Sequence, residues 1–137
     1  MSLKDEIADF LTREFPQTKV TVEAAGNMAA TVRHRIGVDE LRPGGTVSGP
    51  VMMAVADVAL YVAILGEIGL EALTVTTSLN MNFLRKPSAT ADILGECKLL
   101  KLGKRLVVGE VTIYSEGMRE PVAHAVGTYS IPPRKLA

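Results

Sequence analysis

The apolar residues of the chain change their spacing along the sequence, and each spacing predicts a type of secondary structure. Near the N-terminus they recur at the spacing of one helix face. Just before them, Ser2 to Asp5 has the form of a capping box, which marks a helix start. The sequence therefore predicts a short amphipathic N-terminal helix that ends near Pro16. Its apolar positions are Leu3, Ile7, Phe10, Leu11 and Phe15.

Two following stretches alternate between apolar and polar residues, which is the period of a half-buried strand. The first runs from Thr18 to Ala24 and the second from Met28 to Ile36, with the turn signal Gly26-Asn27 between them. The pattern predicts a β-hairpin. The apolar face of its second strand should contain Met28, Ala30, Val32, His34 and Ile36.

The segment from Val51 to Leu65 is almost entirely apolar, and Asp57 is its one charged residue. Gly37 to Gly49 reads as a loop, and Pro50 suits the first turn of a helix, where its missing N–H costs nothing. We expect a helix from Pro50 to about Leu65, closed by Gly66 or Gly69. A helix that is apolar nearly all round must be buried nearly all round. Its length falls short of the ~20 residues of a membrane-spanning helix.

The remaining sequence predicts four meandering strands, and the whole chain, residues 1–137, is expected to form one α+β domain. A curved antiparallel sheet wrapped around the long helix, with the short N-terminal helix beside it, would bury the apolar segment. A second copy of the chain could complete its burial. The four strands should be Val75 to Leu84, Ala91 to Leu102, Arg105 to Ser115 and Val122 to Ile131.

Composition and charge exclude several classes of protein. Fifteen basic and fifteen acidic residues balance, which argues against a nucleic-acid binder and against attachment to anionic lipid. Cys97 is the one cysteine, so the fold needs no oxidising compartment, and the N-terminus has no signal-peptide pattern. We expect a cytoplasmic protein. His34, His124 and Cys97 form no metal-ligand pattern, and no cofactor motif is present.

Two readings of Asp57 stay open on the residues alone. An isolated buried carboxylate is costly, so Asp57 could be a structural residue satisfied by hydrogen bonds or an arginine. It could instead be a catalytic base or nucleophile in apolar surroundings. The absence of a partner in its own helix favours the catalytic reading.

The start of the helix offers a second chemical group. The free N–H groups near Gly49 form a natural site for an anion or an oxyanion. Gly49 and Asp57 are eight residues apart, or ~12 Å along a helix axis, so one small carbonyl cannot touch both. If both act on one bond, two helices must pair antiparallel across a two-fold axis, and each dimer would hold two composite sites.

Several motifs occur together in an order that resembles a known family. Ser48-Gly49-Pro50 is followed at the family's spacing by Asp57, where the family often has His-Gly-Gly and then an acid. Thr77 to Pro87 looks like the family's strand ending in F-L-R-P, Gly103-Lys104-Arg105 like the turn before its next strand, and Ala125 to Thr128 like its final strand. Over residues 18–131 the sequence resembles the hotdog-fold acyl-CoA thioesterases, in the PaaI-like (phenylacetate-degradation) branch of the 4-hydroxybenzoyl-CoA thioesterase superfamily.

The resemblance implies hydrolysis of an acyl-CoA thioester. Asp57 would be the base or nucleophile, and the Gly49 N–H of the facing subunit the oxyanion donor, in a homodimer that pairs into a dimer of dimers. Three departures stand out: Arg42 replaces the usual Asn or Gln, Ser48 the His, and Pro50 the second Gly. The implied substrate-binding residues are Arg42, Ser48, Pro50, Tyr61 and Thr77, and the implied CoA-binding residues are Arg85, Lys86, Lys104 and Arg105.

Purely structural roles for these residues, and other activities of the same fold, compete with this hypothesis. Ser48 is also an N-cap candidate, Tyr61 could be a core tyrosine, and the four basic residues could be ordinary solvated charge. A hotdog hydratase is disfavoured because no His lies between Gly37 and Glu67. A non-catalytic acyl-CoA-binding module remains the main alternative, because the loop before the helix departs from the family pattern.

Overall fold

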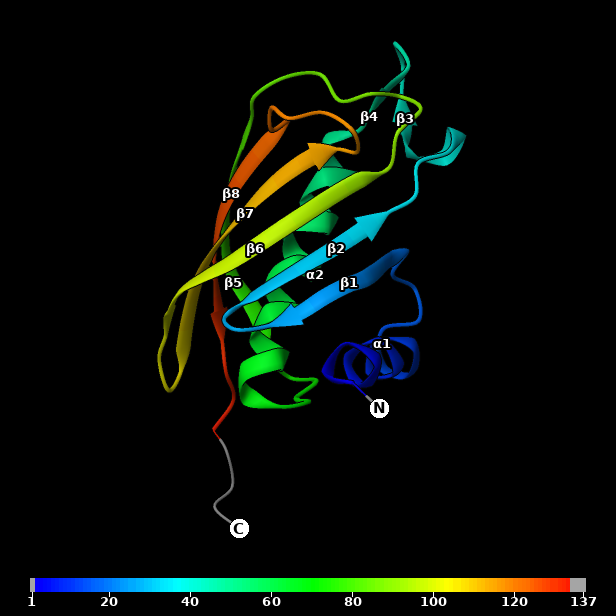
Figure 1. Cartoon of the computed structure of the whole chain (residues 1–137). Coiled ribbons are helices and arrows are strands. Elements are labelled where there is room, and N and C mark those ends of the chain that lie inside the picture. Colours follow the sequence, from blue (N-terminus) through cyan, green and yellow to red (C-terminus); the bar gives the residue numbers. More distant parts are fainter. Residues whose placement is uncertain (1, 134–137) are drawn as a thin grey trace.

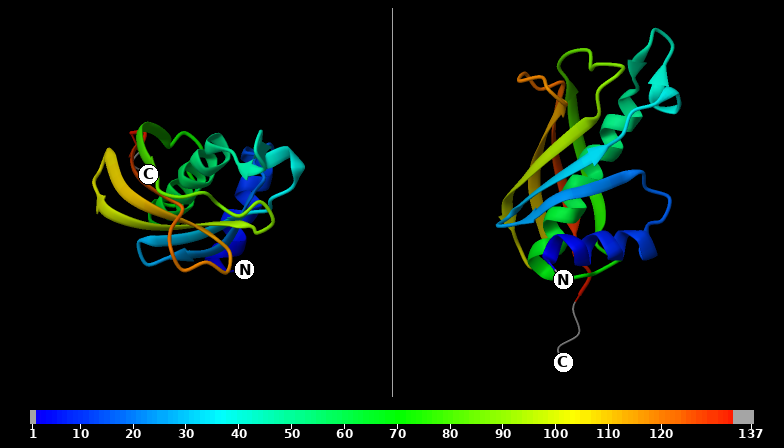
Figure 2. Two further views of the ribbon diagram at one scale, coloured as in Figure 1. Left: turned by 90° about the horizontal axis from the view of Figure 1, so that it is seen from above. Right: turned by 45° about the vertical axis from the view of Figure 1, so that its right-hand side comes forward.

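A computed structural model describes residues 2–133 of the chain. A curved six-stranded sheet packs against one long helix, and a shorter helix crosses the end of the sheet beside the first strand (Figure 1). A view from above shows how the sheet curves around the long helix (Figure 2). The elements are α1 (Leu3–Glu14), β1 (Val20–Gly26), β2 (Ala29–His34), β3 (Leu41–Arg42), β4 (Thr46–Val47), α2 (Gly49–Ile68), β5 (Val75–Phe83), β6 (Ile93–Leu102), β7 (Leu106–Ser115) and β8 (Ala123–Ser130).

The order of strands across the sheet is β1-β2-β6-β7-β8-β5, and every pairing is antiparallel. The α+β class and the curved sheet around a helix are confirmed. The expected meander of four strands is wrong in one respect. Only β6, β7 and β8 follow one another, because β5 crosses to the far edge beside β8 and β6 pairs with β2. This crossing makes β5 an edge strand.

The N-terminal helix forms as expected, and the hairpin forms with its turn one residue later than expected, at Asn27-Met28. The Ser2 side chain accepts a hydrogen bond from the Asp5 N–H and caps α1, which buries one apolar stripe. Asn27 and Met28 both have positive φ, 56° and 62°, which is the two-residue turn that matches the twist of paired strands. His34 is buried on the apolar face. The inward positions of β8 are the odd-numbered ones, so His124 points away from the core and pairs with Glu110 at 3.1 Å.

Helix α2 starts one residue earlier and ends three residues later than expected. The Ser48 side chain accepts from the Val51 N–H at 3.4 Å and caps it, and Gly69, at a φ of 95°, ends it. Its 20 residues and mean hydropathy of 2.0 meet the length and composition of a membrane span, so the expectation that it is too short was wrong. Its burial against the sheet identifies it as the core helix of a soluble fold.

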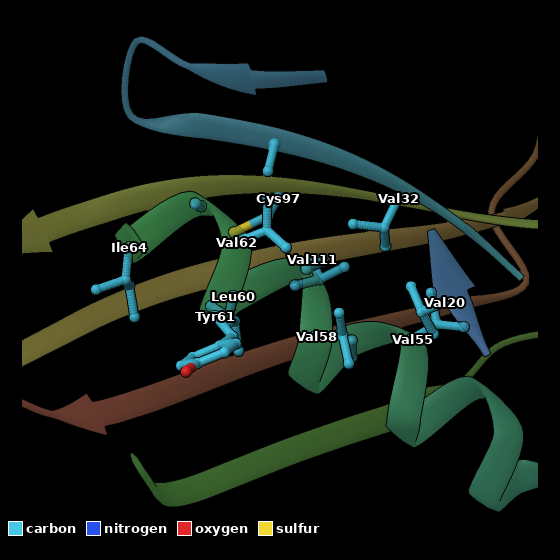
Figure 3. Packing of buried hydrophobic residues seen from close by; sticks show 14 of the residues in the cluster. Val20, Val32, Val55, Val58, Leu60, Tyr61, Val62, Ile64, Cys97 and Val111 are labelled. Atoms are coloured by element: carbon cyan, nitrogen blue, oxygen red, sulfur yellow. The ribbon is translucent and has the colours of Figure 1, made fainter. Parts of the chain in front are cut away.

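Three glycines let α2 lie close to the sheet. They are on the face of the central strands that α2 covers, where Val55, Leu60 and Val111 pack (Figure 3). An added Cβ at Gly127 would lie 2.4 Å from Cδ1 of Leu60, which is far inside van der Waals contact. Gly95 and Gly109 are similarly close to α2, with Cβ positions 2.7 Å from Val55 and Leu60 respectively. The glycines therefore set the depth at which α2, and Asp57 on it, sits.

The predicted loop from Gly37 to Gly49 contains regular structure. A 3-10 turn (Val38–Glu40) leads into the β3–β4 hairpin, which ends at Val47, directly before the cap residue Ser48. The Glu40 carboxylate accepts from the Gly37 N–H at 2.8 Å and pairs with Lys19 at 3.1 Å, while its carbonyl accepts from the Ser48 N–H at 3.0 Å. Glu40 therefore anchors the segment that presents the start of α2.

Candidate active site

Asp57 is half-buried on α2 and is held by two hydroxyl groups from the sheet. Tyr129 on β8 donates to Oδ1 of Asp57 at 2.7 Å and to its backbone carbonyl at 2.8 Å. Thr76 on β5 donates to the same Oδ1 at 2.6 Å. Among residues 2–133, Oδ2 has no hydrogen-bond partner. One oxygen of the carboxylate is thus fixed and the other is available.

The Tyr129 hydroxyl remains a hydrogen-bond donor to this carboxylate at physiological pH. Burial, and after it the negative charge of Asp57, raises the pKa of Tyr129, so the phenol stays protonated over the physiological pH range. Its ring stacks on Tyr61 with centroids 6.2 Å apart, and Tyr61 in turn contacts Phe10 of α1 at 6.5 Å. These ring contacts fix the direction from which Tyr129 reaches Asp57.

A cavity of about 420 Å³ opens beside Asp57. It lies between the C-terminal end of α1, the middle of α2, and the segment that leads into β5. Tyr61, one turn after Asp57, is buried and lines the same cavity, and its hydroxyl donates to the Ala72 carbonyl at 3.4 Å. Tyr61 therefore combines the two roles that the sequence left open: it packs in the core and it lines the cavity.

Gly49 is the first residue of α2, and its backbone N–H has no acceptor among the described residues. The position expected for its Cβ is 3.4 Å from Cζ of Phe83, so the Phe83 ring lies against the helix start. Ser48 uses its hydroxyl as the helix cap, in agreement with the structural reading of that residue.

The two candidate groups of one chain stand at opposite ends of β5. Asp57 contacts Thr76 near the beginning of the strand, and Gly49 contacts Phe83 at its end. Thr76 and Phe83 are ~23 Å apart along the extended strand, whereas Asp57 and Gly49 themselves are ~12 Å apart along α2. Within one chain Asp57 and Gly49 are thus directed at different places.

Three other expected substrate-binding residues lie apart from Asp57. Arg42 is exposed on the β3–β4 hairpin, and Pro50 is exposed on the first turn of α2. The Thr77 hydroxyl donates to the Thr128 carbonyl at 3.2 Å, at the irregularity where the pairing of β5 with β8 shifts by one residue. That shift is why Thr76, and not Thr77, faces Asp57.

The four basic residues expected to bind CoA form two pairs at opposite ends of the sheet. Arg85 and Lys86 follow β5, and Arg85 is paired with Glu120 and the Pro121 carbonyl. Lys104 and Arg105 lie in the β6–β7 turn and line a separate cavity of about 590 Å³. The Ile131 N–H donates to the Arg105 carbonyl, so this second pair lies near the beginning of β5, where Val75 pairs with Ser130.

Sequence reasoning missed Thr76 and Tyr129 as neighbours of Asp57. The one available signal was Tyr129 itself, a hydroxyl-bearing residue at an inward position of a strand whose other inward residues are small, Ala123, Ala125 and Gly127. Within residues 2–133, no group of three or more His, Cys, Asp or Glu residues could hold a metal ion. Cys97 is buried, which raises the pKa of its thiol to about 12.

Comparison with known proteins identifies the family. Residues 44–122, more than half of the chain, match the family model described as "Thioesterase superfamily". A crystal structure of a candidate thioesterase from Silicibacter sp. TM1040 shares 46% identity, with a TM-score of 0.87 over 95% of this chain and 92% of that one. No curated protein matches significantly.

More distant structures share the fold. Zebra fish thioesterase superfamily member 2 has 17% identity and a TM-score of 0.84, over 96% of this chain and all of that one. A point mutant of the phenylacetic acid degradation protein PaaI from Thermus thermophilus has 24% identity and a TM-score of 0.72, over 89% of this chain and 97% of that one. These likenesses and the match above confirm the resemblance seen in the sequence. The chain belongs to the thioesterase superfamily and has the hotdog fold.

Proposed function

We propose that the protein is a cytoplasmic enzyme of one domain that hydrolyses an acyl-CoA thioester to the free acid and CoA. The observation that carries this proposal is the Asp57 carboxylate, fixed through Oδ1 by Thr76 and Tyr129 and open at Oδ2, beside a cavity of about 420 Å³. A carboxylate that only stabilised the fold would have no need of a free oxygen at a cavity.

Two chemical routes start from Oδ2 of Asp57. In the first, Oδ2 takes a proton from water while the water oxygen adds to the thioester carbonyl, and the tetrahedral oxyanion expels CoA thiolate, which takes that proton. In the second, Oδ2 itself adds to the carbonyl and expels CoA thiolate, and water then hydrolyses the mixed anhydride. In both, the Gly49 N–H of the facing subunit donates to the oxyanion.

A homodimer completes the site in this proposal. The β5 edge is open, carries no charged residue, and leaves Val75 and Phe83 about half exposed, at 53% and 52%. Such an edge is a template for pairing with another strand. Antiparallel pairing of two β5 strands about a point between Leu79 and Asn80 places Thr76 opposite Phe83 of the facing subunit. Because Phe83 contacts Gly49 and Thr76 contacts Asp57, this register brings Gly49 of one subunit to Asp57 of the other.

The same pairing gives the basic residues a common role. It brings Arg85 and Lys86 of the facing subunit to the end of β5 where Lys104 and Arg105 of the first subunit lie. Four cations from two chains would then surround the CoA phosphates. Arg42, Ser48, Pro50 and Thr77 would contact the substrate from the facing helix start and the shared edge, and two dimers would pair into a tetramer.

Release of CoA thiol from a panel of aryl- and alkyl-CoA thioesters tests the activity. The wild-type protein should hydrolyse at least one of them, and Asp57→Asn should lower kcat by at least about a thousandfold while binding the same acyl-CoA. Circular dichroism and thermal unfolding of the variant should match the wild type. Binding of acyl-CoA without hydrolysis by the wild-type protein would favour the alternative, a non-catalytic acyl-CoA-binding hotdog protein.

A further inference from the structure

A second, smaller cavity also reaches Asp57. It has a volume of about 260 Å³, and its wall includes Asp57, Val58 and Phe15, which line the larger cavity as well. The larger cavity extends toward β5 and the segment before it, whereas the smaller one extends toward β1 and β2, through Val20 and His34. These two strands lie at the opposite edge of the sheet from β5 (Figure 1). The two cavities therefore meet at Asp57 and run away from it in different directions.

His34 brings a free ring nitrogen to the smaller cavity. The residue is 6% exposed, and its Nδ1 lies 2.7 Å from the Arg35 carbonyl oxygen, which can only accept, so Nδ1 carries a proton. Nε2 has no hydrogen-bond partner among residues 2–133. Among those residues, the fully buried side-chain nitrogen and oxygen atoms without a partner are Oγ1 of Thr46 and Oγ1 of Thr74, so Nε2 is not sealed in the core. It therefore opens on the cavity that His34 lines.

The other polar side chains at this cavity have partners of their own or are exposed. Lys19 pairs with Glu40 at 3.1 Å. The Thr18 hydroxyl accepts from the Val20 N–H at 3.2 Å, and Gln17 is exposed. A buried polar atom without a partner costs free energy, which a ligand group that hydrogen-bonds to it recovers. The rest of the wall is apolar and comes from Phe15, Val20, Ala54 and Val58.

The proposed dimer leaves the smaller cavity for the acyl group. Its register places Arg85 of the facing subunit opposite Thr74, which lines the larger cavity. The basic turn between β6 and β7 lies near the same end of β5. The larger cavity thus leads from Asp57 to the cations that would surround the CoA phosphates, which suits the pantetheine arm of CoA. Because the acyl and CoA parts of a thioester extend to opposite sides of its carbonyl, the acyl part would extend toward His34.

We propose that the smaller cavity binds the acyl group, and that His34 makes it select an acyl chain that carries a hydroxyl group. A hydroxyl both donates and accepts, so it can pair with Nε2 in either protonation state of the ring. An unsubstituted alkyl chain would cover Nε2 and leave it unpaired. The inference rests on the proposed acyl-CoA hydrolysis and names the class of its acyl group. His34 acts here as a specificity determinant and takes no part in bond cleavage.

Binding of thioethers tests the inference apart from hydrolysis, because a thioether has no carbonyl to cleave. The compounds are S-alkyl-CoA thioethers from propyl to heptyl, and ω-hydroxyalkyl thioethers in which the hydroxyl replaces the terminal methyl group. Titration calorimetry with the wild-type protein should show the hydroxyl compound binding at least about fivefold more tightly than its methyl counterpart at one chain length or two neighbouring ones. Other lengths should show no gain, because Nε2 is met at one depth only.

Two substitutions of His34 assign this preference to Nε2. The amide of Gln reaches about as far as Nε2, whereas the amide of Asn reaches only about as far as Nδ1. His34→Gln should therefore keep most of the preference, and His34→Asn should reduce it to less than about twofold. His124→Asn is the matched control, because it changes the histidine that points away from the core, and it should keep the wild-type preference. The preference is a ratio of two Kd values for one protein, so a general loss of affinity cancels.

The possible failures are distinguishable. A preference at no chain length, binding of none of the compounds, or an equal preference in His34→Gln and His34→Asn would overturn the inference. Acyl-CoA hydrolysis measured in parallel reports on the proposed function. If the protein binds the thioethers with the expected preference but cleaves no acyl-CoA, the specificity stands and the hydrolase proposal fails. If it cleaves acyl-CoA without the preference, the hydrolase proposal stands and the role of His34 fails.

Discussion

The Tyr129 hydroxyl contacts Asp57 twice, at Oδ1 over 2.7 Å and at the backbone carbonyl over 2.8 Å. Tyr129 and Thr76 both donate to Oδ1, so two strands set the plane of the carboxylate, while Oδ2 has no hydrogen-bond partner among the described residues. A hydrogen bond to a charged group contributes about 1.5–3 kcal/mol, which is enough to hold one rotamer of a half-buried aspartate. Loss of either hydroxyl should therefore misdirect Oδ2.

Tyr129→Phe keeps the ring and its stacking on Tyr61 but removes the donor. We expect kcat for a good acyl-CoA to fall about 10- to 100-fold, because a misdirected carboxylate is less often aligned with the carbonyl. The Michaelis constant should change less than about threefold, since substrate contacts remain. Steady-state kinetics separate the two parameters.

Tyr114→Phe is the control for that experiment, because Tyr114 lies on β7 with no hydrogen bond of its hydroxyl among the described residues. Thr76→Val should mimic Tyr129→Phe, while Thr76→Ser, which keeps the hydroxyl, should retain most of the activity. A loss of kcat that Thr76→Ser does not rescue would show that the hydroxyl of Thr76 is not what positions Asp57.

Gly127→Ala should destabilise the fold by about 1–3 kcal/mol, because its Cβ would overlap Cδ1 of the fully buried Leu60. The cost should be smaller in a Leu60→Val background, which removes the overlapping methyl groups. Urea unfolding of the wild type, the two single variants and the double variant gives the coupling energy between Gly127 and Leu60. Val126→Ala, next along β8 but half exposed, should cost much less, and equal costs at the two positions would contradict the proposed close approach of α2.

The Glu40 carboxylate should make stability fall in acid. The Gly37 N–H, and after it Lys19, lowers the pKa of Glu40. A lowered folded-state pKa gives stability that is fully present above the unfolded pKa of about 4.5 and is lost as the pH falls through the folded value. Glu40→Gln should therefore be less stable than the wild type at pH 7, and the difference should shrink as the pH falls below about 4.5. Urea midpoints measured from pH 7 into acid test this, and a difference that does not shrink would refute the assignment.

Cys97 should be inert in the native protein. Burial, and after it the charge of Glu110, raises the pKa of its thiol to about 12, so at pH 8 only ~1 in 10,000 molecules carries the thiolate. A thiol reagent should react with native protein only over hours and with one thiol per chain after unfolding. Rapid reaction of the native protein would mean that Cys97 is accessible. Slow reaction also means that the CoA-release assay has no background from the enzyme.

The elements could be predicted from the sequence where a local signal exists. The alternation around Val32, the cap at Ser48 and the apolar run of α2 each reflect the environment of that segment alone, and all three were confirmed. Strand order could not be predicted, because the alternation in β5 is the same whether the strand lies beside β6 or beside β8. The four strands were therefore expected as a meander, and β5 was not expected at the edge.

The candidate site could be predicted only in part, because only some of its contacts lie within one element. Asp57 and Tyr61 share a helix face, so their common position at the cavity follows from a spacing of four residues. The contacts of Asp57 with Thr76 and Tyr129 depend on pairing between β5 and β8, which are joined only through the long-range fold. The close approach at Gly127 has no local signal either, because it depends on Leu60 of a distant helix.

The central claim is that Asp57 of one subunit and the Gly49 N–H of the facing subunit form one hydrolytic site. Gly49→Pro removes that N–H at the first helical position, where proline is tolerated, and Gly49→Ala keeps it as the matched control. Asp57→Asn and Gly49→Pro should each inactivate the protein. Unfolded together in equal amounts and refolded, the two should regain about a quarter of wild-type acyl-CoA hydrolysis, because one site in four combines an intact Asp57 with an intact Gly49. No recovery above the separately refolded variants, with mixed assemblies demonstrated, would contradict a site shared between subunits.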